Sequence, residues 1–342
     1  MTGMFRSTIS ALALALAASP VAAETKLLFS TFFPKAHPFV ANVLEPWAAD
    51  VEAATGGNVD IEFAASSLAP PAEQLDMVQN GVADIAVQFA GVVPNRLGAY
   101  QISEIPGVVG SSEAMSVALW RTHEAHLADA FDSKRLRILS AFVFPAQGMY
   151  STDDTPLASL EDVKAAKIAT TPGIPATAVG SLTGGVIAGP AFRYFELVSK
   201  GMVDAYMTVT PLEVMGFNLS RYTKVATSMG DISTAGSFVL VINEKAWRGL
   251  SEEDRAAIES QSGEAFSRRM AALDIAAGAA EEKMKDEGIV FEAISPEFEA
   301  DLKSAFAFLE DDWNARMEQA GIDGEAAMSM YRETIKQVQA GG

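Results

Sequence analysis

Two stretches of the chain follow the same pattern of residues. Residues 79–88 read QNGVADIAVQ and residues 199–208 read SKGMVDAYMT, so in both a polar pair precedes Gly, two apolar residues, Asp and an apolar run. A Gly at this place is typical of a helix that ends in a left-handed residue, and an Asp at a turn accepts backbone N–H groups. The repeat therefore predicts two sharp helix-to-strand turns, braced by Asp84 and Asp204.

The length of the chain favours two lobes, because a single hydrophobic core stops growing near about 250–300 residues and this chain has 342. Strand patterns at 26–30, 59–63, 84–89, 136–144, 167–170, 203–209 and 237–243 alternate with helical patterns, and a long helix is expected from 251 to 286. Such alternation predicts an α/β fold with mostly parallel or mixed sheets.

The two strands of the repeat also indicate where a ligand is expected. Ligands of open α/β sheets bind beyond the carboxyl ends of the strands. The pair Gln88-Phe89 ends one strand and the run 208–210 ends the other. We therefore expect these two ends to face a cleft, one from each lobe.

The N-terminus has the features of a secretory signal. Arg6 precedes a short apolar run at 9–18, and small residues at 21–23 suit cleavage near Ala23. A membrane anchor is the alternative, but a spanning helix needs about 20 apolar residues. Removing Arg6 takes the net charge from −19 to −20, which argues against nucleic acid and anionic membranes as partners. The expected location is the periplasm.

Chemistry-bearing motifs are scarce. His123 and His126 share a predicted helix face, but a zinc site needs further ligands, and the chain has no Cys and only three His. His37 lies in a proline-flanked loop, where a structural role is favoured. Nucleotide-binding glycine motifs and the nucleophile elbow are absent from the sequence. These observations favour a binding protein without metal or cofactor over an enzyme.

The order of several motifs resembles the solute-binding proteins of tripartite ATP-independent periplasmic (TRAP) transporters. The motifs are FSTFFPKAHP at 29–38, TGGNVDIEF at 55–63, QLDMVQNGVADIAV at 74–87, EIPGVV at 104–109, TPLASLEDVKAAKIATTP at 155–172, KGMVDAY at 200–206 and FVLVINEKAWRGLSEEDRAAI at 238–258. The resemblance extends from about Lys26 to Gln339.

The resemblance implies a two-lobed periplasmic binding protein fold with hinge strands and a long helix spanning both lobes. The implied lobes are 24–146 with about 232–272, and 147–231 with about 273–342, after a signal peptide at 1–23. It implies a non-enzymatic receptor, expected to be a monomer, that closes on a small organic solute and docks on the membrane subunits of a TRAP permease. A sensor subunit that presents its closed form to a membrane kinase is an alternative.

The sequence departs from the family where the family binds a ligand carboxylate. Ala169 stands where the family usually has an arginine that pairs with the carboxylate, and Thr208 stands where it usually has Asn. A second family arginine, before the residues that match Ser151-Thr152, is also missing. We therefore expect a solute that is not held by the usual arginine–carboxylate pair. The alternative is a carboxylate held by Arg193, although an exposed Arg193 is favoured.

An aromatic-rich cleft remains as the basis for binding. It would suit an apolar or aromatic solute, or a cation held over aromatic rings. The candidate ligand-binding residues are Phe32, Phe33, Gln88, Phe89, Gln147, Tyr150, Ala169, Thr170, Phe192, Arg193, Thr208 and Thr210.

Overall fold

The computed structural model describes residues 25–131 and 133–341, so the predicted signal peptide lies outside the described residues. The first of two sheets has the strand order β2-β1-β3-β10-β4. Its strands are β1 (Thr25–Ser30), β2 (Val59–Phe63), β3 (Ile85–Phe89), β4 (Leu136–Val143) and β10 (Ser237–Asn243). β1 pairs in parallel with β2 and β3, whereas β10 runs antiparallel to β3 and β4.

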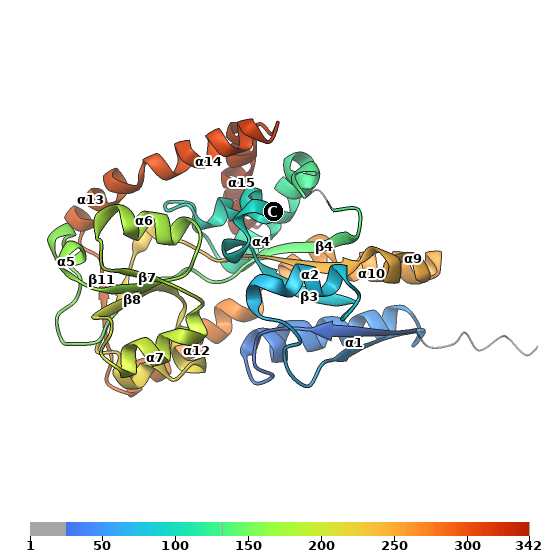
Figure 1. Cartoon of the computed structure of the whole chain (residues 1–342), viewed down its shortest axis with the longest axis horizontal. Helices are drawn as coiled ribbons and strands as arrows, with labels where there is room; N and C mark the ends of the chain where they lie inside the picture. Colours follow the sequence, from blue (N-terminus) through green and yellow to red (C-terminus); the bar gives the residue numbers. More distant parts are fainter. Residues whose placement is uncertain (1–24, 132, 342) are drawn as a thin grey trace, which may run out of the picture.

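The second sheet has the order β11-β9-β5-β8-β6-β7. Its strands are β5 (Gly148–Ser151), β6 (Ile168–Thr170), β7 (Val186–Ala188), β8 (Ala205–Val209), β9 (Val225–Ser228) and β11 (Val290–Ala293). β6 is parallel to β7 and β8, and β5 is antiparallel to β8 and β9. We call the first sheet with its helices the first lobe, and the second sheet with its helices the second lobe (Figure 1).

The chain passes between the lobes twice in short connections between strands. One passage joins β4 to β5, and the other joins β9 to β10. Both passages return the chain to a central position of a sheet, because β10 lies between β3 and β4 and β5 lies between β8 and β9. Every residue of β10 is buried, as expected for a strand with neighbours on both sides.

Helices cover the faces of both sheets. Their bounds are α1 (Glu45–Ala54), α2 (Gln74–Gln79), α3 (Pro94–Leu97), α4 (Ser112–Thr122), α5 (Leu160–Ala165), α6 (Ile174–Leu182), α7 (Tyr194–Ser199), α8 (Pro211–Gly216), α9 (Glu244–Gly249), α10 (Glu252–Gln261), α11 (Gly263–Arg268), α12 (Ala271–Asp286), α13 (Pro296–Phe306), α14 (Phe308–Gln319) and α15 (Gly324–Gln339).

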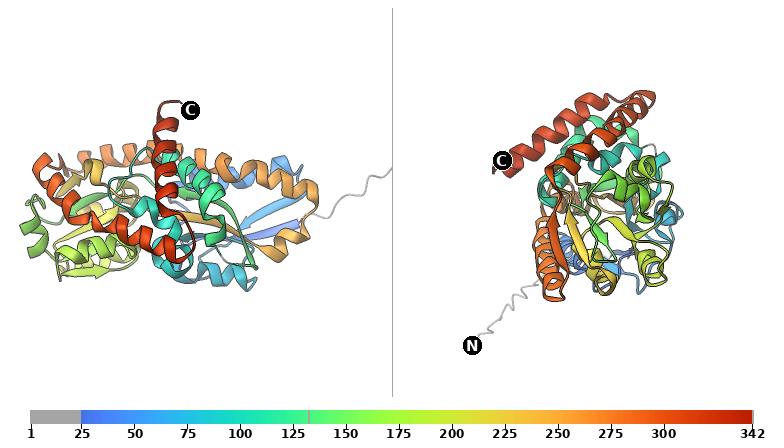
Figure 2. Two further views of the ribbon diagram at one scale, coloured as in Figure 1. Left: turned by 90° about the horizontal axis from the view of Figure 1, so that it is seen from above. Right: turned by 90° about the vertical axis from the view of Figure 1, so that its left-hand side faces the viewer.

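The single helix expected from 251 to 286 is wrong in detail. The segment is divided into α10, α11 and α12. Gly263 has φ +57, and a Cβ there would lie 2.9 Å from the Trp120 ring, so the chain turns at a residue that only Gly fits. The series still runs along one side of both lobes (Figure 2), and α12 packs against α4 of the first lobe and α8 of the second.

The C-terminal helices return to the first lobe. α13 packs against α5, whereas α15 packs against α4. The Trp313 indole N–H on α14 donates to the Gly98 carbonyl at 3.1 Å. The assignment of about 273–342 to the second lobe stays a prediction. In the structure, α14 and α15 pack on the first lobe.

The repeated motif forms as the sequence predicts. Gly81 and Gly201 have φ +72 and +61, the left-handed values that end a helix on Gly. The Asp84 carboxylate accepts the Leu28 N–H at 2.8 Å, and the Asp204 carboxylate accepts the Lys167 N–H at 2.8 Å. Both aspartates thus join the turn to the neighbouring parallel strand, and the bracing role is confirmed.

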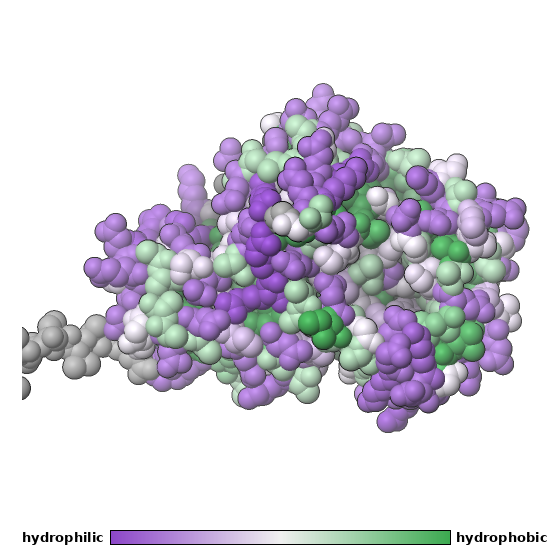
Figure 3. Space-filling model, turned by 180° about the vertical axis from the view of Figure 1, so that it is seen from behind, coloured by the Kyte–Doolittle hydropathy of each residue, from purple (hydrophilic) through white to green (hydrophobic). Residues whose placement is uncertain are grey.

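Polar side chains cover most of the face opposite that of Figure 1, with apolar ones in small separate groups (Figure 3). Among the described residues, no helix combines the length and the apolar character that crossing a membrane requires.

Candidate functional site

A cavity lies between the two lobes, where β1, β3, β6 and β8 end. Its volume is about 80 Å³. The lining residues come from both lobes and are Phe32, Phe33, Pro71, Phe89, Val92, Phe144, Gln147, Thr171, Pro190, Ala191, Phe192, Thr208, Val209, Thr210, Glu213, Phe217, Gly236 and Phe238. The cavity is therefore at the carboxyl ends of the parallel strands, as the repeat predicts.

Phenylalanine rings from the first lobe form one wall. The Phe33 ring stacks on Phe32 and Phe144 with centroid distances of 4.6 and 5.4 Å. Phe238 connects this group to Phe89, with centroid distances of 4.4 Å to Phe144 and 5.1 Å to Phe89. Offset and tilted ring pairs of this kind present flat apolar faces, which suit contact with another planar ring.

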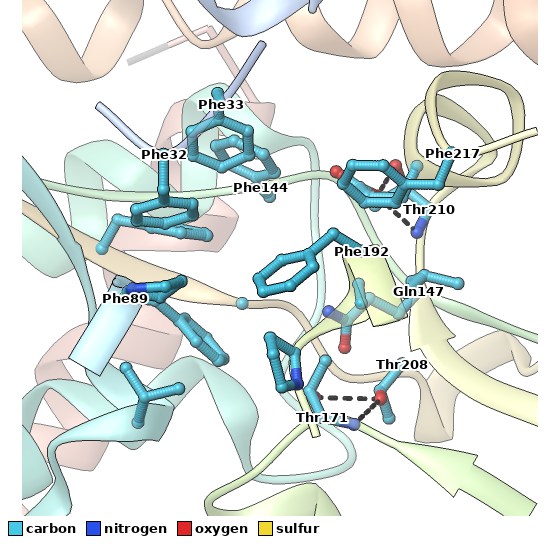
Figure 4. Close-up of a pocket in the computed structure, with 18 residues that line it drawn as sticks. Phe32, Phe33, Phe89, Phe144, Gln147, Thr171, Phe192, Thr208, Thr210 and Phe217 are labelled. Atoms are coloured by element: carbon cyan, nitrogen blue, oxygen red, sulfur yellow. Dashed lines mark hydrogen bonds between the residues drawn. The ribbon is translucent and has the colours of Figure 1, made fainter. Parts of the chain in front are cut away.

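Phe192 projects into the cavity from the second lobe. It belongs to the short turn η7 (Ala191–Arg193) and leaves 48% of its surface exposed. Figure 4 shows its ring between Phe32, Phe33 and Phe144 on one side and Gln147 and Thr208 on the other. The half-exposed ring therefore offers an apolar face to the cavity.

Polar side chains form the opposite corner. The Thr208 hydroxyl accepts both the N–H and the hydroxyl of Thr171, each at 2.9 Å. Thr208 has φ +63, a left-handed conformation that costs a β-branched residue about 1–3 kcal/mol. The Gln147 Oε1 accepts the Thr234 hydroxyl at 2.7 Å. That bond orients the amide, and its NH₂ group forms no hydrogen bond within the described residues.

One carboxylate completes the wall. Glu213 lies on α8, where Thr210 caps the helix, and its Oε2 accepts the Thr210 N–H at 2.8 Å. His37 Nδ1 accepts the Phe39 N–H at 3.2 Å, so the ring proton is on Nε2, which lies 3.6 Å from Glu213 Oε1. That separation is longer than a hydrogen bond, so Oε1 retains capacity to accept. No Lys or Arg lines the described cavity.

Seven of the predicted ligand-binding residues line the cavity: Phe32, Phe33, Phe89, Gln147, Phe192, Thr208 and Thr210. The other five do not. Gln88 is fully buried and binds the Leu75 N–H and the Pro71 carbonyl. Tyr150 stacks on Tyr206 inside the second lobe.

Ala169 and Thr170 are fully buried in β6. Thr170 does not reach the cavity, but its hydroxyl lies 3.1 Å from that of Thr208, which does. Arg193 is exposed and does not line the cavity. This arrangement gives no support to a carboxylate held by Arg193.

Several of the lining residues were not predicted from the sequence. Phe144 follows β4 directly and Phe238 lies near the start of β10, and an apolar run does not reveal which of its residues borders a cavity. Glu213 had a signal in the sequence, because Thr210 and Glu213 have the spacing of a capping box. Phe217, just after α8, had none.

Comparison with known proteins gives one family and a set of similar folds. The family described as "Bacterial extracellular solute-binding protein, family 7" matches residues 29–316. A relative described as the outer membrane transporter protein TsaT of Comamonas testosteroni is 33% identical over 331 residues, which cover 96% of this chain and 97% of the relative.

Similar solved structures include a TRAP periplasmic solute-binding protein from Bordetella bronchiseptica with bound (R)- and (S)-mandelate. It has a TM-score of 0.87 at 24% identity and covers 92% of this chain and 99% of its own. A TRAP solute-binding protein from Rhodoferax ferrireducens T118 with copurified benzoate has a TM-score of 0.84 at 21% identity, with coverage of 93% and 100%. These matches confirm the predicted two-lobed fold.

Proposed function

This chain belongs to the bacterial extracellular solute-binding proteins of family 7, and we propose that it captures a small aromatic solute by closure of its two lobes. The family consists of receptors that bind small organic solutes and work with TRAP permeases. We propose further that the signal peptide at 1–23 is removed near Ala23 on export to the periplasm, and that the receptor acts as a monomer.

The proposal rests on the phenylalanine rings that both lobes contribute to the cavity. Phe32, Phe33, Phe89, Phe144, Phe192, Phe217 and Phe238 all line one small cavity. Apolar burial yields about 25 cal/mol per Å², and ring pairs add about 0.5–1.5 kcal/mol beyond the area. A planar ring gains from both terms, whereas a compact polar molecule gains from neither.

The charges in the lining support a solute that needs no arginine. An anion buried without a cation loses its hydration and gains no ion pair, and here Glu213 adds repulsion. Gln147 offers donors and Glu213 Oε1 offers an acceptor. A neutral aromatic molecule with a polar substituent, or an aromatic cation, satisfies these groups. The mandelate and benzoate bound to the similar structures share the aromatic ring of the proposed solute but, as carboxylates, differ from it in charge.

A thermal-shift screen tests the proposal. Benzamide, benzyl alcohol and benzylamine represent aromatic solutes, and succinate and pyroglutamate represent aliphatic acids. A solute at 100 times its Kd stabilises the folded protein by about 2.7 kcal/mol. We expect a rise in melting temperature with at least one aromatic solute. Stabilisation by the aliphatic acids alone would overturn the proposal.

A further inference from the structure

Glu104 is a buried carboxyl beside the cavity, at the contact between the two lobes. It ends the turn η4 (Gly98–Glu104) and is 1% exposed. From the first lobe, the Gln101 amide donates to Oε2 at 2.7 Å and the Ser237 hydroxyl donates to Oε1 at 3.0 Å. From the second lobe, Gly173 lies against this carboxyl, and the backbone N–H of Ile174, at the start of α6, faces it.

The two lobes are in close contact at this point. Gly173 has φ +93, and a Cβ on it would lie 2.4 Å from Gln101 Nε2 and 2.8 Å from Glu104 Oε2. A Cβ on Gly91 would lie 2.8 Å from the Pro172 carbonyl oxygen. Two glycines, one from each lobe, therefore permit the close approach that brings the Ile174 N–H to Glu104.

The same segment of the second lobe forms part of the cavity wall. Thr171 lines the cavity, and Gly173 and Ile174 follow it directly in the chain. Resting on the proposed function, we propose that Glu104 is a positioning residue for lobe closure, because its buried carboxyl meets Gly173 of the second lobe only when the segment that includes Thr171 is brought up to the solute. The solute and Glu104 thus favour the same arrangement of the lobes, which is the condition for coupling.

Lobe closure also changes the affinity of Glu104 for a proton. Burial raises the pKa of Glu104 to about 8 in the closed arrangement. The facing groups are the neutral Gln101, Ser237 and Ile174 N–H, which lower the pKa by donating to the carboxyl, and Arg316 on α14, whose charge lowers it least; burial outweighs all four. When the lobes separate, the carboxyl meets water and its pKa falls. The closed arrangement therefore binds the proton more tightly, and a rise in pH toward 8 favours opening.

Fluorescence energy transfer across the lobes tests this inference. The chain has no Cys, so Ser66→Cys and Ser199→Cys, both at exposed positions, place one dye on each lobe. The closed fraction is counted in single molecules between pH 6 and 9, with and without benzamide, benzyl alcohol and benzylamine. Glu104→Gln keeps the size of the side chain and an acceptor oxygen but does not titrate. Glu73→Gln, at an exposed position of the first lobe, is the matched control.

We expect the closed fraction of the parent and of Glu73→Gln to fall at least threefold as the pH rises through 8, and that of Glu104→Gln to stay level. A closed fraction that does not respond to pH in the parent, an equal response in Glu104→Gln, or no closed molecules under any condition would overturn the inference. The proposed function fails separately, if none of the three aromatic solutes changes the melting temperature while the pH response persists.

Discussion

Thr208 Oγ1 accepts the backbone N–H of Thr171 at 2.9 Å, and this bond joins the ends of β8 and β6 at the cavity wall. The bond is made from a backbone conformation that β-branched residues rarely adopt, since Thr208 has φ +63. Strain of this kind persists only where the surroundings hold it. Here it places one hydroxyl in contact with the polar corner of the cavity.

Thr208→Asn should therefore be tolerated, because Asn adopts the left-handed region readily and keeps a side-chain acceptor. Thr208→Val keeps the strain and leaves the buried Thr171 N–H without a partner, which should lower the free energy of unfolding by about 1–3 kcal/mol. Urea denaturation of both variants measures the difference. Thr177→Val, at an exposed position, should change stability by less than about 0.5 kcal/mol. Equal losses in all three variants would contradict the role of Thr208.

Glu104 should make the stability of the folded protein depend on pH. Its pKa rises from the usual 4.5 to about 8 on folding because the carboxyl is buried. Between these values the folded protein holds a proton that the unfolded chain has released, so stability falls as pH rises and levels off above about 8. Relative to wild type, Glu104→Gln should gain stability across this window. Urea denaturation at a series of pH values checks this, and parallel curves would contradict it.

Gly173→Ala should weaken solute binding. The new Cβ would meet Gln101 and Glu104 of the other lobe, in a backbone conformation that disfavours Ala. The open form avoids that contact, so closure loses free energy and the Kd for an aromatic solute should rise at least tenfold. Gly184→Ala, where a Cβ has open space, is the control and should leave the Kd unchanged. Similar Kd values for the two variants would refute the close contact at Gly173.

Variants of two neighbouring exposed phenylalanines distinguish an effect on solute binding from an effect on stability. Phe192 lines the cavity, whereas Phe195 does not, and their exposures are 48% and 39%. Phe192→Ala removes a ring that contacts the solute and should raise its Kd by about tenfold, with little change in melting temperature. Phe195→Ala should leave the Kd unaltered. Calorimetric titration of both variants measures this, and an effect confined to Phe195→Ala would contradict the position of the solute.

The sequence located the cavity at the strand ends but resolved its residues only in part. Phe89 was placed correctly because it ends a predicted strand. Gln88 was not, since neighbouring strand residues point to opposite faces, and its amide turns to the Leu75 N–H behind the cavity. Tyr150 has the same aromatic character as Phe192, yet it stacks on Tyr206 inside a lobe. Residue type alone does not distinguish these two environments.

Local sequence patterns do not predict the contacts between the lobes. Glu104 appeared in the sequence only within a family motif, and its burial depends on Ser237 and Ile174, which lie 133 and 70 positions away. The break at Gly263 likewise depends on Trp120. Both features arise from packing between distant segments, which hydrophobic periodicity does not encode.

Calorimetric titration with benzamide and benzoate shows whether the cavity selects against a negative charge, because the two solutes share a ring and a shape and differ in charge. The cavity lining contains Glu213 and no Lys or Arg. We predict that the wild-type protein binds benzamide at least as tightly as benzoate. Benzoate binding more than tenfold tighter than benzamide would contradict it, because such a preference requires a cation at the solute.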